Sequence, residues 1–242
     1  MRAWQLPLSF EFEADYTFDN FVAAGNEISF HQFYELAQQR PPEPIYLWGD
    51  SGAGKTHLLR AFVETAQQQG ERVAWFSSGS LVPWSGFEDS TLIVLDDCQA
   101  LDAHQQHAAF IAFVDASGRG VPVLAAGKLP PIDLPLRDDL RSRLGWGHVL
   151  HVQPLSEITL REVVNKEASR RGLHLSEEVL NYLLRRFDRH INTLLPLVEQ
   201  LDRFSLSRQR LITLPLLKEM LKEDWKFLTH EGDSSCIAVN KT

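Results

Sequence analysis

One octapeptide, Gly49 to Thr56, constrains the fold of this chain more than any other stretch. It reads Gly-Asp-Ser-Gly-Ala-Gly-Lys-Thr and fits the phosphate-binding loop pattern of a glycine, four residues, and then Gly-Lys-Ser/Thr. An apolar run over 45–48 precedes it, and apolar residues at helical spacing follow it from Leu58 to Ala66. The sequence therefore predicts a strand, a glycine-rich turn and a helix, the arrangement that surrounds a phosphate with backbone N–H groups.

The phosphate-loop interpretation gives particular residues a role. Lys55 is expected to reach the β- and γ-phosphates, and the Thr56 hydroxyl to ligate Mg²⁺. A glycine-rich turn with an incidental lysine is the alternative, and the complete match in the right context argues against it. The candidate nucleotide-binding residues here are Gly49, Ser51, Gly52, Ala53, Gly54, Lys55, Thr56 and His57.

A second chemical landmark lies at Thr91–Asp97, where four apolar residues precede two acids. This pattern predicts a buried parallel strand whose carboxylates emerge at its carboxyl end, where open α/β sheets bind ligands. Asp96 is then a candidate Mg²⁺ ligand, and Asp97 a candidate for orienting an attacking water. A strand that simply ends in two acids is the alternative.

Composition narrows the class of protein. With 242 residues and 44% hydrophobic residues, the chain suits one α/β domain and a small second one. A net charge of -8 does not favour strong direct binding of DNA or of an anionic membrane. Cys98 and Cys236 offer no disulfide framework or zinc spacing, and no signal peptide or long apolar span is evident. A cytoplasmic protein is expected.

The remaining periodicity predicts an α/β half and a helical half. Strands are predicted over 72–76, 121–126 and 148–152, and helices over 28–37 and 103–116. Residues 137–147 are charged and then rich in turn formers. From Pro154 onward, helices are predicted over 156–171, 176–187, 192–204 and 213–225. The fold class is thus a parallel five-stranded sheet with helices, followed by a small helical domain, and a disordered tail is expected over 229–242.

From about Tyr16 to Lys222 the sequence resembles the AAA+ module of the bacterial replication initiator DnaA. The stretch 16–22, Tyr-Thr-Phe-Asp-Asn-Phe-Val, looks like the entry motif of that clade, and 49–56 and 95–97 look like its Walker A and B motifs. The resemblance implies that Tyr16, Phe18 and Phe21 line the pocket of the nucleotide base, which holds ADP or ATP with Mg²⁺.

An arginine-rich stretch is the most clade-specific part of the resemblance. The stretch 140–147, Leu-Arg-Ser-Arg-Leu-Gly-Trp-Gly, is similar to the arginine-finger box of the clade. The resemblance makes Arg143 the finger, a catalytic residue aimed at a neighbour's phosphates. From the residues alone, the arginines here are equally open to solvation or to pairing with Asp138 and Asp139.

The N-terminal stretch Gln5-Leu6-Pro7-Leu8 resembles a peptide that binds the DNA polymerase sliding clamp. The resemblance assigns clamp contacts to Gln5, Leu6 and Leu8, although the apolar segment is equally open to packing on its own domain. No DNA-binding domain is expected after the lid. A clamp-binding tail on a DnaA-like body resembles the Hda family, which works with the DNA-loaded clamp to stimulate ATP hydrolysis by DnaA.

Two positions depart from the initiator's pattern. Gly127, followed by Lys128, aligns with the sensor 1 acid, and Asn192 aligns with the sensor 2 arginine. Arg189 lies about one helical turn from Asn192 and is a candidate to compensate as a nucleotide contact. Loss of both sensors weakens the case for hydrolysis of the chain's own nucleotide more than the case for nucleotide binding.

The expected organisation is a clamp-binding tail over 1–15, an AAA+ domain over 16–153, a lid over 154–228 and a tail over 229–242. The expected function is regulatory, with DnaA and the sliding clamp as partners, no membrane partner, and self-association left open. A self-hydrolysing AAA+ ATPase such as a DnaC-like helicase loader is the enzyme-class rival. An initiator-like DNA-binding protein is a third interpretation, which the acidic balance disfavours.

Overall fold

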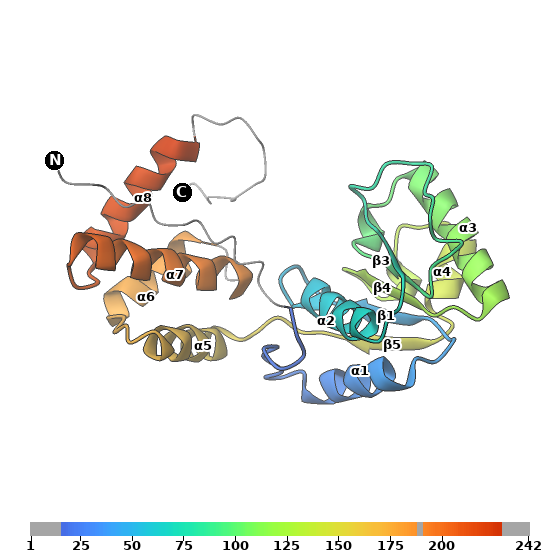
Figure 1. Ribbon diagram of the computed structural model, residues 1–242, viewed down its shortest axis with the longest axis horizontal. Coiled ribbons are helices and arrows are strands. Elements are labelled where there is room, and N and C mark those ends of the chain that lie inside the picture. Colours follow the sequence, from blue (N-terminus) through green and yellow to red (C-terminus); the bar gives the residue numbers. More distant parts are fainter. Residues whose placement is uncertain (1–15, 188–190, 229–242) are drawn as a thin grey trace. The chain divides into compact units, whose positions relative to one another are not determined.

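The computed structural model describes residues 16–187 and 191–228 (Figure 1). The expectations for the tails, including those for Gln5, Leu6, Leu8 and the stretch 229–242, lie outside the described residues, as does Arg189. The chain divides into two compact units, and the main boundary along the sequence falls between Gln153 and Pro154. In the described part, no helix is long and apolar enough to cross a membrane.

The first unit is built on a five-stranded sheet in which every strand pair is parallel. The strand order is β2-β3-β4-β1-β5, so β1 lies between β4 and β5. Because β3 and β4 are buried along their whole length, they are the near-continuous apolar runs that a covered parallel sheet requires. This sheet confirms the predicted fold class. Its strands are β1 Ile45–Trp48, β2 Val73–Phe76, β3 Leu92–Leu95, β4 Val123–Gly127 and β5 His148–His151.

Helices cover both faces of the sheet, with α1 and α2 on one side and α3 and α4 on the other (Figure 1). The helix α3 begins at a capping box formed by Asp102 and Gln105 and ends where Gly120 adopts a left-handed conformation. The helices of this unit are α1 Glu27–Gln39, α2 Lys55–Gln68, α3 Ala103–Arg119 and α4 Asp138–Leu144, with 3-10 turns η1 Cys98–Ala100 and η2 Pro131–Asp133.

The helix α4 is a structure that the sequence pattern did not reveal. It is only seven residues long, which is too short to show helical periodicity. Two fully buried residues, Leu140 and Leu144, stand one turn apart and anchor it on the core under α3. The charged residues between them therefore lie on its outer side.

The second unit holds the helices α5 Glu157–Arg170, α6 Glu177–Arg186, α7 Ile191–Arg208 and α8 Leu214–Leu228. The side chains of Ser156 and Ser176 accept backbone N–H groups at the starts of α5 and α6 and so cap these two helices. A core rich in leucine and valine, from Leu160 to Met220, holds the helices together.

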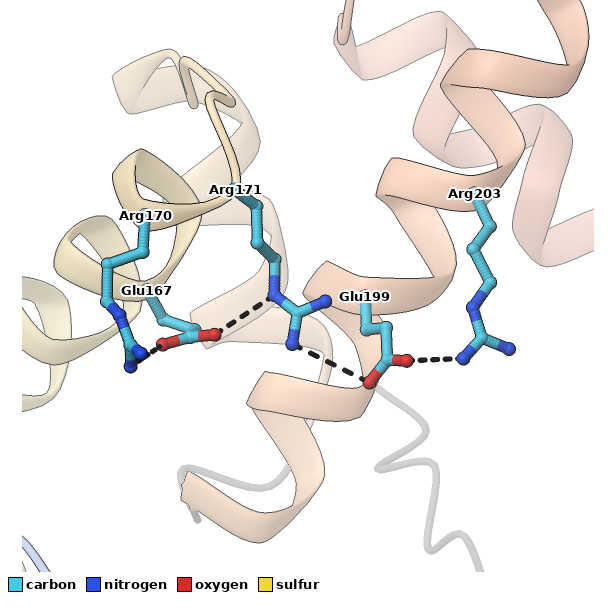
Figure 2. A network of polar contacts seen from close by, with 5 residues as sticks. All are labelled: Glu167, Arg170, Arg171, Glu199 and Arg203. Carbon is cyan, nitrogen blue, oxygen red and sulfur yellow. Dashed lines mark hydrogen bonds and ion pairs between the residues drawn. The ribbon is translucent and has the colours of Figure 1, made fainter. Parts of the chain in front are cut away.

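A chain of ion pairs links the end of α5 to α7 on the surface of this unit (Figure 2). Arg171 lies between Glu167, at 3.0 Å, and Glu199, at 3.8 Å. Arg170 and Arg203 extend the chain at its two ends. Partly exposed ion pairs contribute only about 0–1 kcal/mol each to stability. The apolar core therefore contributes most of the stability of this unit, and the ion pairs add little to it.

Candidate functional site

The loop from Gly49 to Lys55 has a backbone that only glycine satisfies at its key positions. Gly52 and Gly54 have φ of 73° and 99°, in the region that glycine adopts without strain. A Cβ atom on Gly49 would lie 1.9 Å from the carbonyl oxygen of Val152, and one on Gly54 would lie 2.7 Å from the Phe21 ring. The glycines therefore serve both the curl of the loop and the close packing around it.

Lys55 is buried at the start of α2, with its ammonium directed at the loop itself. Its Nζ donates to the carbonyl oxygens of Gly49, at 2.8 Å, and Asp50, at 2.9 Å. Burial lowers the pKa of Lys55, and the nearby charges of Asp97, Asp96 and Asp50 oppose that effect. Lys55 makes no ion pair within the described part of the chain, so no carboxylate there neutralises its ammonium.

The hydroxyl of Thr56 and the carboxylate of Asp96 meet between the loop and the end of β3. Thr56 Oγ1 donates to Asp96 Oδ2 at 2.9 Å, while Asp96 Oδ1 accepts the backbone N–H of Asp97. Burial raises the pKa of Asp96 in spite of the Thr56 hydrogen bond. These oxygens are the hard ligands that Mg²⁺ takes in phosphate-loop proteins, so the residues fit the ion expected beside the phosphates.

Asp97 differs from Asp96 because its side chain is exposed. The backbone of Asp97 has φ of 53°, which turns the chain from β3 into η1. Its Oδ1 accepts a hydrogen bond from Gln99 Nε2 at 3.3 Å, and Gln99 Oε1 accepts the backbone N–H of Lys128 at 2.8 Å. Gln99 therefore bridges the second acid to the chain just after β4, a role that no sequence pattern revealed.

The position aligned with sensor 1 is closed by a neighbouring side chain. A Cβ atom on Gly127 would lie 2.1 Å from the hydroxyl oxygen of Tyr46, a fully buried residue of β1. That hydroxyl donates to the carbonyl oxygen of Leu129 at 2.8 Å. Any side chain at residue 127 would displace Tyr46, so the absence of an acid there has a structural cause. The sequence pattern did not reveal this role of Tyr46, because Tyr46 lies within an apolar run that predicts only a strand.

The N-terminal aromatic segment divides into two environments. The rings of Tyr16 and Phe21 stand edge-on to His57, at centroid distances of 5.2 and 5.4 Å. His57 Nε2 lies 2.9 Å from the carbonyl oxygen of Thr17, and burial lowers the pKa of His57, which favours the neutral ring. Phe18 instead packs against rings of α1. Two of the three aromatic residues predicted at the base pocket, Tyr16 and Phe21, thus lie beside His57 at the start of α2.

The arginines of α4 have unequal partners. Arg137 pairs with Asp139 and Arg141 pairs with Asp138, as one alternative for this stretch had it. Arg143 makes no ion pair among the residues described, and its guanidinium lies over the Phe110 ring at 5.2 Å. It lines a surface hollow with Trp146, whose side chain is 78% exposed. Asn192, the residue aligned with sensor 2, follows Ile191 in α7, and its side chain is outside the described set.

Together, the phosphate loop, the acidic pair after β3, the parallel sheet and the helical unit define an AAA+ nucleotide-binding protein. Comparisons with known proteins narrow the class. Residues 12–83 match the model of the bacterial DnaA ATPase domain, and residues 158–221 match that of the Hda lid domain. The chain is an AAA+ protein of the DnaA clade, similar to Hda.

Solved structures agree with this assignment. Domain III of the Thermotoga maritima initiator DnaA is 26% identical with a TM-score of 0.69, covering 87% of this chain and 97% of that one. AMPPCP-bound DnaA from Aquifex aeolicus is 23% identical with a TM-score of 0.64, covering 89% of this chain and 71% of that one, and at this identity it supports the fold alone. The Thermotoga maritima RuvB branch-migration motor, at 15% identity and a TM-score of 0.59, covers 86% of this chain and 71% of that one and shares the fold alone.

Proposed function

We propose that this chain is a nucleotide-bound regulator of DnaA in the cytoplasm, which stimulates hydrolysis of DnaA-bound ATP and thereby limits initiation of replication. In this proposal Arg143 enters the ATPase site of DnaA. The observation that carries it is the state of Arg143, which has no carboxylate partner in the described chain while Arg137 and Arg141 are paired.

The placement of Arg143 supports a role in trans. It lies in the last turn of α4, whose buried face is fixed by Leu140 and Leu144, and the Phe110 ring supports its guanidinium. An arginine held in this way, but without a counter-charge, is suited to stabilise charge on a transferring phosphoryl group of another molecule. The exposed Trp146 beside it offers apolar contact area to that partner.

The resident nucleotide is proposed to be ADP or ATP with Mg²⁺, because an initiator of this clade is known bound to the ATP analogue AMPPCP. Lys55 binds the phosphates, Thr56 and Asp96 hold the ion, and Tyr16, Phe21 and His57 supply the base contacts. The ion would neutralise phosphate charge. The lid residues Arg189 and Asn192 are proposed as further nucleotide contacts, and Phe18 acts through the packing of the aromatic segment.

The sliding clamp is the second proposed partner. Its proposed ligand is the segment with Gln5, Leu6 and Leu8, which lies outside the described residues, so this part rests on sequence resemblance alone. The proposal requires Gln5→Ala combined with Leu6→Ala to lose binding to purified clamp while the melting temperature stays unchanged. A large fall in melting temperature would show that the segment belongs to the folded core.

The decisive experiment measures hydrolysis of DnaA-bound ATP in the presence of clamp loaded on DNA. We expect Arg143→Ala to abolish the stimulation, because a finger supplies on the order of 10³–10⁵ in rate. The matched control is Arg141→Ala, which removes the same side chain from the same helix but breaks an internal pair. Stimulation by Arg143→Ala at the wild-type level would refute the finger assignment.

A self-hydrolysing ATPase is the second candidate, and the exposed Asp97 at the end of β3 is the observation that favours it. In that case the isolated chain turns over ATP at a robust rate, and Asp97→Asn removes the turnover. Under the regulatory proposal the isolated chain has little turnover to lose, because the Tyr46 hydroxyl closes the position at Gly127. Measuring both rates on the chain alone separates the two functions.

A further inference from the structure

Lysine is rare in the α/β unit, and its placement is informative. Residues 16–153 contain two lysines, Lys55 and Lys128, while every other strong cation in this range is arginine. Both lysines lie at the carboxyl edge of the sheet, since Lys55 follows the loop after β1 and Lys128 directly follows β4. The strands β1 and β4 are hydrogen-bonded neighbours, with Trp48 opposite Gly127.

The backbone of Lys128 is fixed beside the phosphate loop. The carbonyl oxygen of Gly127 accepts the N–H of Gly49 at 3.3 Å, and the N–H of Lys128 is held by Gln99. Gly49 in turn accepts Lys55 Nζ through its own carbonyl oxygen. The two lysines are therefore connected through Gly49, which hydrogen-bonds to Lys55 Nζ on one side and to the residue before Lys128 on the other. The charge of Lys128 contributes to lowering the pKa of Lys55.

Lys128, like Lys55, has no carboxylate partner in the described part of the chain. Its side chain is exposed, and it makes no ion pair within residues 16–187 and 191–228. The arginines of the same unit are used differently, because most of them pair with a carboxylate: Arg40, Arg119, Arg137 and Arg141. Lysine is a compact, flexible point charge that suits a phosphate approached from one side.

We propose that Lys128 is a second phosphate-binding cation, whose ammonium contacts the terminal phosphate of a nucleoside triphosphate held in the loop. The inference rests on the nucleotide binding of the proposed function and adds a preference within it. Because the Tyr46 hydroxyl leaves no room for a side chain on Gly127, residue 128 is the first position after β4 that can reach a ligand. A cation there favours triphosphate over diphosphate through charge.

The test compares affinities of the full chain for AMPPCP and for ADP, each with Mg²⁺, by titration calorimetry. We expect Lys128→Gln to weaken AMPPCP binding about tenfold, the order of one hydrogen bond to a charged group, and to change ADP binding less than about twofold. Lys128→Arg should keep most of the AMPPCP affinity. The matched control is Arg72→Gln, which removes one positive charge from an exposed side chain at the amino edge of the sheet.

Three results would overturn the inference: equal losses for both nucleotides, no loss for either, or the same loss in Arg72→Gln, which would indicate a general effect of net charge. Failure of the wild-type chain to bind either nucleotide would instead refute the nucleotide site of the proposed function. Retained AMPPCP binding by Lys128→Gln, together with lost binding by Lys55→Ala, would refute the role of Lys128 alone.

Discussion

The phosphate loop and the helix α4 each carry a cation for which we propose a phosphate partner, yet the two cations differ in how many contacts the chain makes with them. Around the loop, Lys55 donates to two carbonyl oxygens and Asp96 accepts two hydrogen bonds, and both side chains are at least 90% buried. On α4, Arg143 is partly exposed and contacts one aromatic ring.

This difference agrees with the two proposed roles, a nucleotide site built within the chain and an arginine that acts on a second molecule. Preorganised, buried charges lower the cost of reorganisation when a ligand enters, and their own desolvation is the cost the fold bears. A partly exposed arginine bears little such cost and contributes little to stability. Substitutions at the loop should therefore change nucleotide binding and also shift stability, in a direction that depends on the residue, whereas a substitution of Arg143 should change function alone.

The largest expected effect is on stability and concerns Gly49. We expect Gly49→Ala to lower the free energy of unfolding by about 3 kcal/mol or more, because the added Cβ would meet a backbone oxygen of Val152 that cannot move aside. Denaturant titration measures the change. The control is Gly118→Ala within α3, where the Cβ meets nothing and helix propensity favours alanine by about 1 kcal/mol. Equal stabilities of the two variants would contradict the tight fit at Gly49.

The next effect concerns Lys55, whose removal should change nucleotide binding more than it changes folding. Lys55→Ala should weaken binding of Mg²⁺-nucleotide at least 100-fold, about 2.7 kcal/mol, since it removes the cation aimed at the phosphates. Stability without nucleotide should hold or rise, because a buried charge without an ion-pair partner is removed. Calorimetry with ATP gives the affinity. Tight binding by the variant would mean that the loop is not the site.

A smaller effect of the opposite sign is expected at Asp96. Burial raises the folded-state pKa of Asp96 above the ordinary range of an aspartate, so the stability linked to this group is greatest below the unfolded-state pKa and is lost as the pH rises through the folded-state pKa. Asp96→Asn cannot ionise, its single amide oxygen can accept the Asp97 N–H, and its amide N–H can donate to the Thr56 hydroxyl. It should therefore be more stable than the wild type at pH 7 without nucleotide, as measured by denaturant titration, and lose the Mg²⁺ dependence of nucleotide binding. A loss of stability would show that the ionised carboxylate is favoured where it lies.

The sequence predicted the parallel sheet and the helical lid because their signals are local: apolar runs, serine caps and glycine stops. It missed α4, whose seven residues are fixed by contacts of Leu140 and Leu144 with distant parts of the chain. It also missed Tyr46 and Gln99, because their roles depend on which strands become neighbours in the sheet. The sequence alignment could show that Gly127 stands where the initiator has an acid. The reason, a Tyr46 hydroxyl that leaves no room for a side chain there, became visible only in the structure.

The smallest expected effect is the change in stability on removal of the Arg143 side chain. Arg143→Ala should lower the free energy of unfolding by only about 0.5 kcal/mol, the order of one cation–π contact at an exposed site, or about 2 °C in melting temperature. The matched control is Arg119→Ala in the same unit, because the Arg119 guanidinium pairs with Asp115 and donates to the carbonyl oxygens of Ser90 and Phe87. That variant should lose about 2 kcal/mol, since two loop carbonyls lose their donor. If Arg143→Ala destabilises the chain as much as Arg119→Ala, Arg143 is a structural residue, and lost stimulation of DnaA would no longer identify a finger. If it leaves stability near the wild type, any lost stimulation reports on what the arginine does in the second molecule.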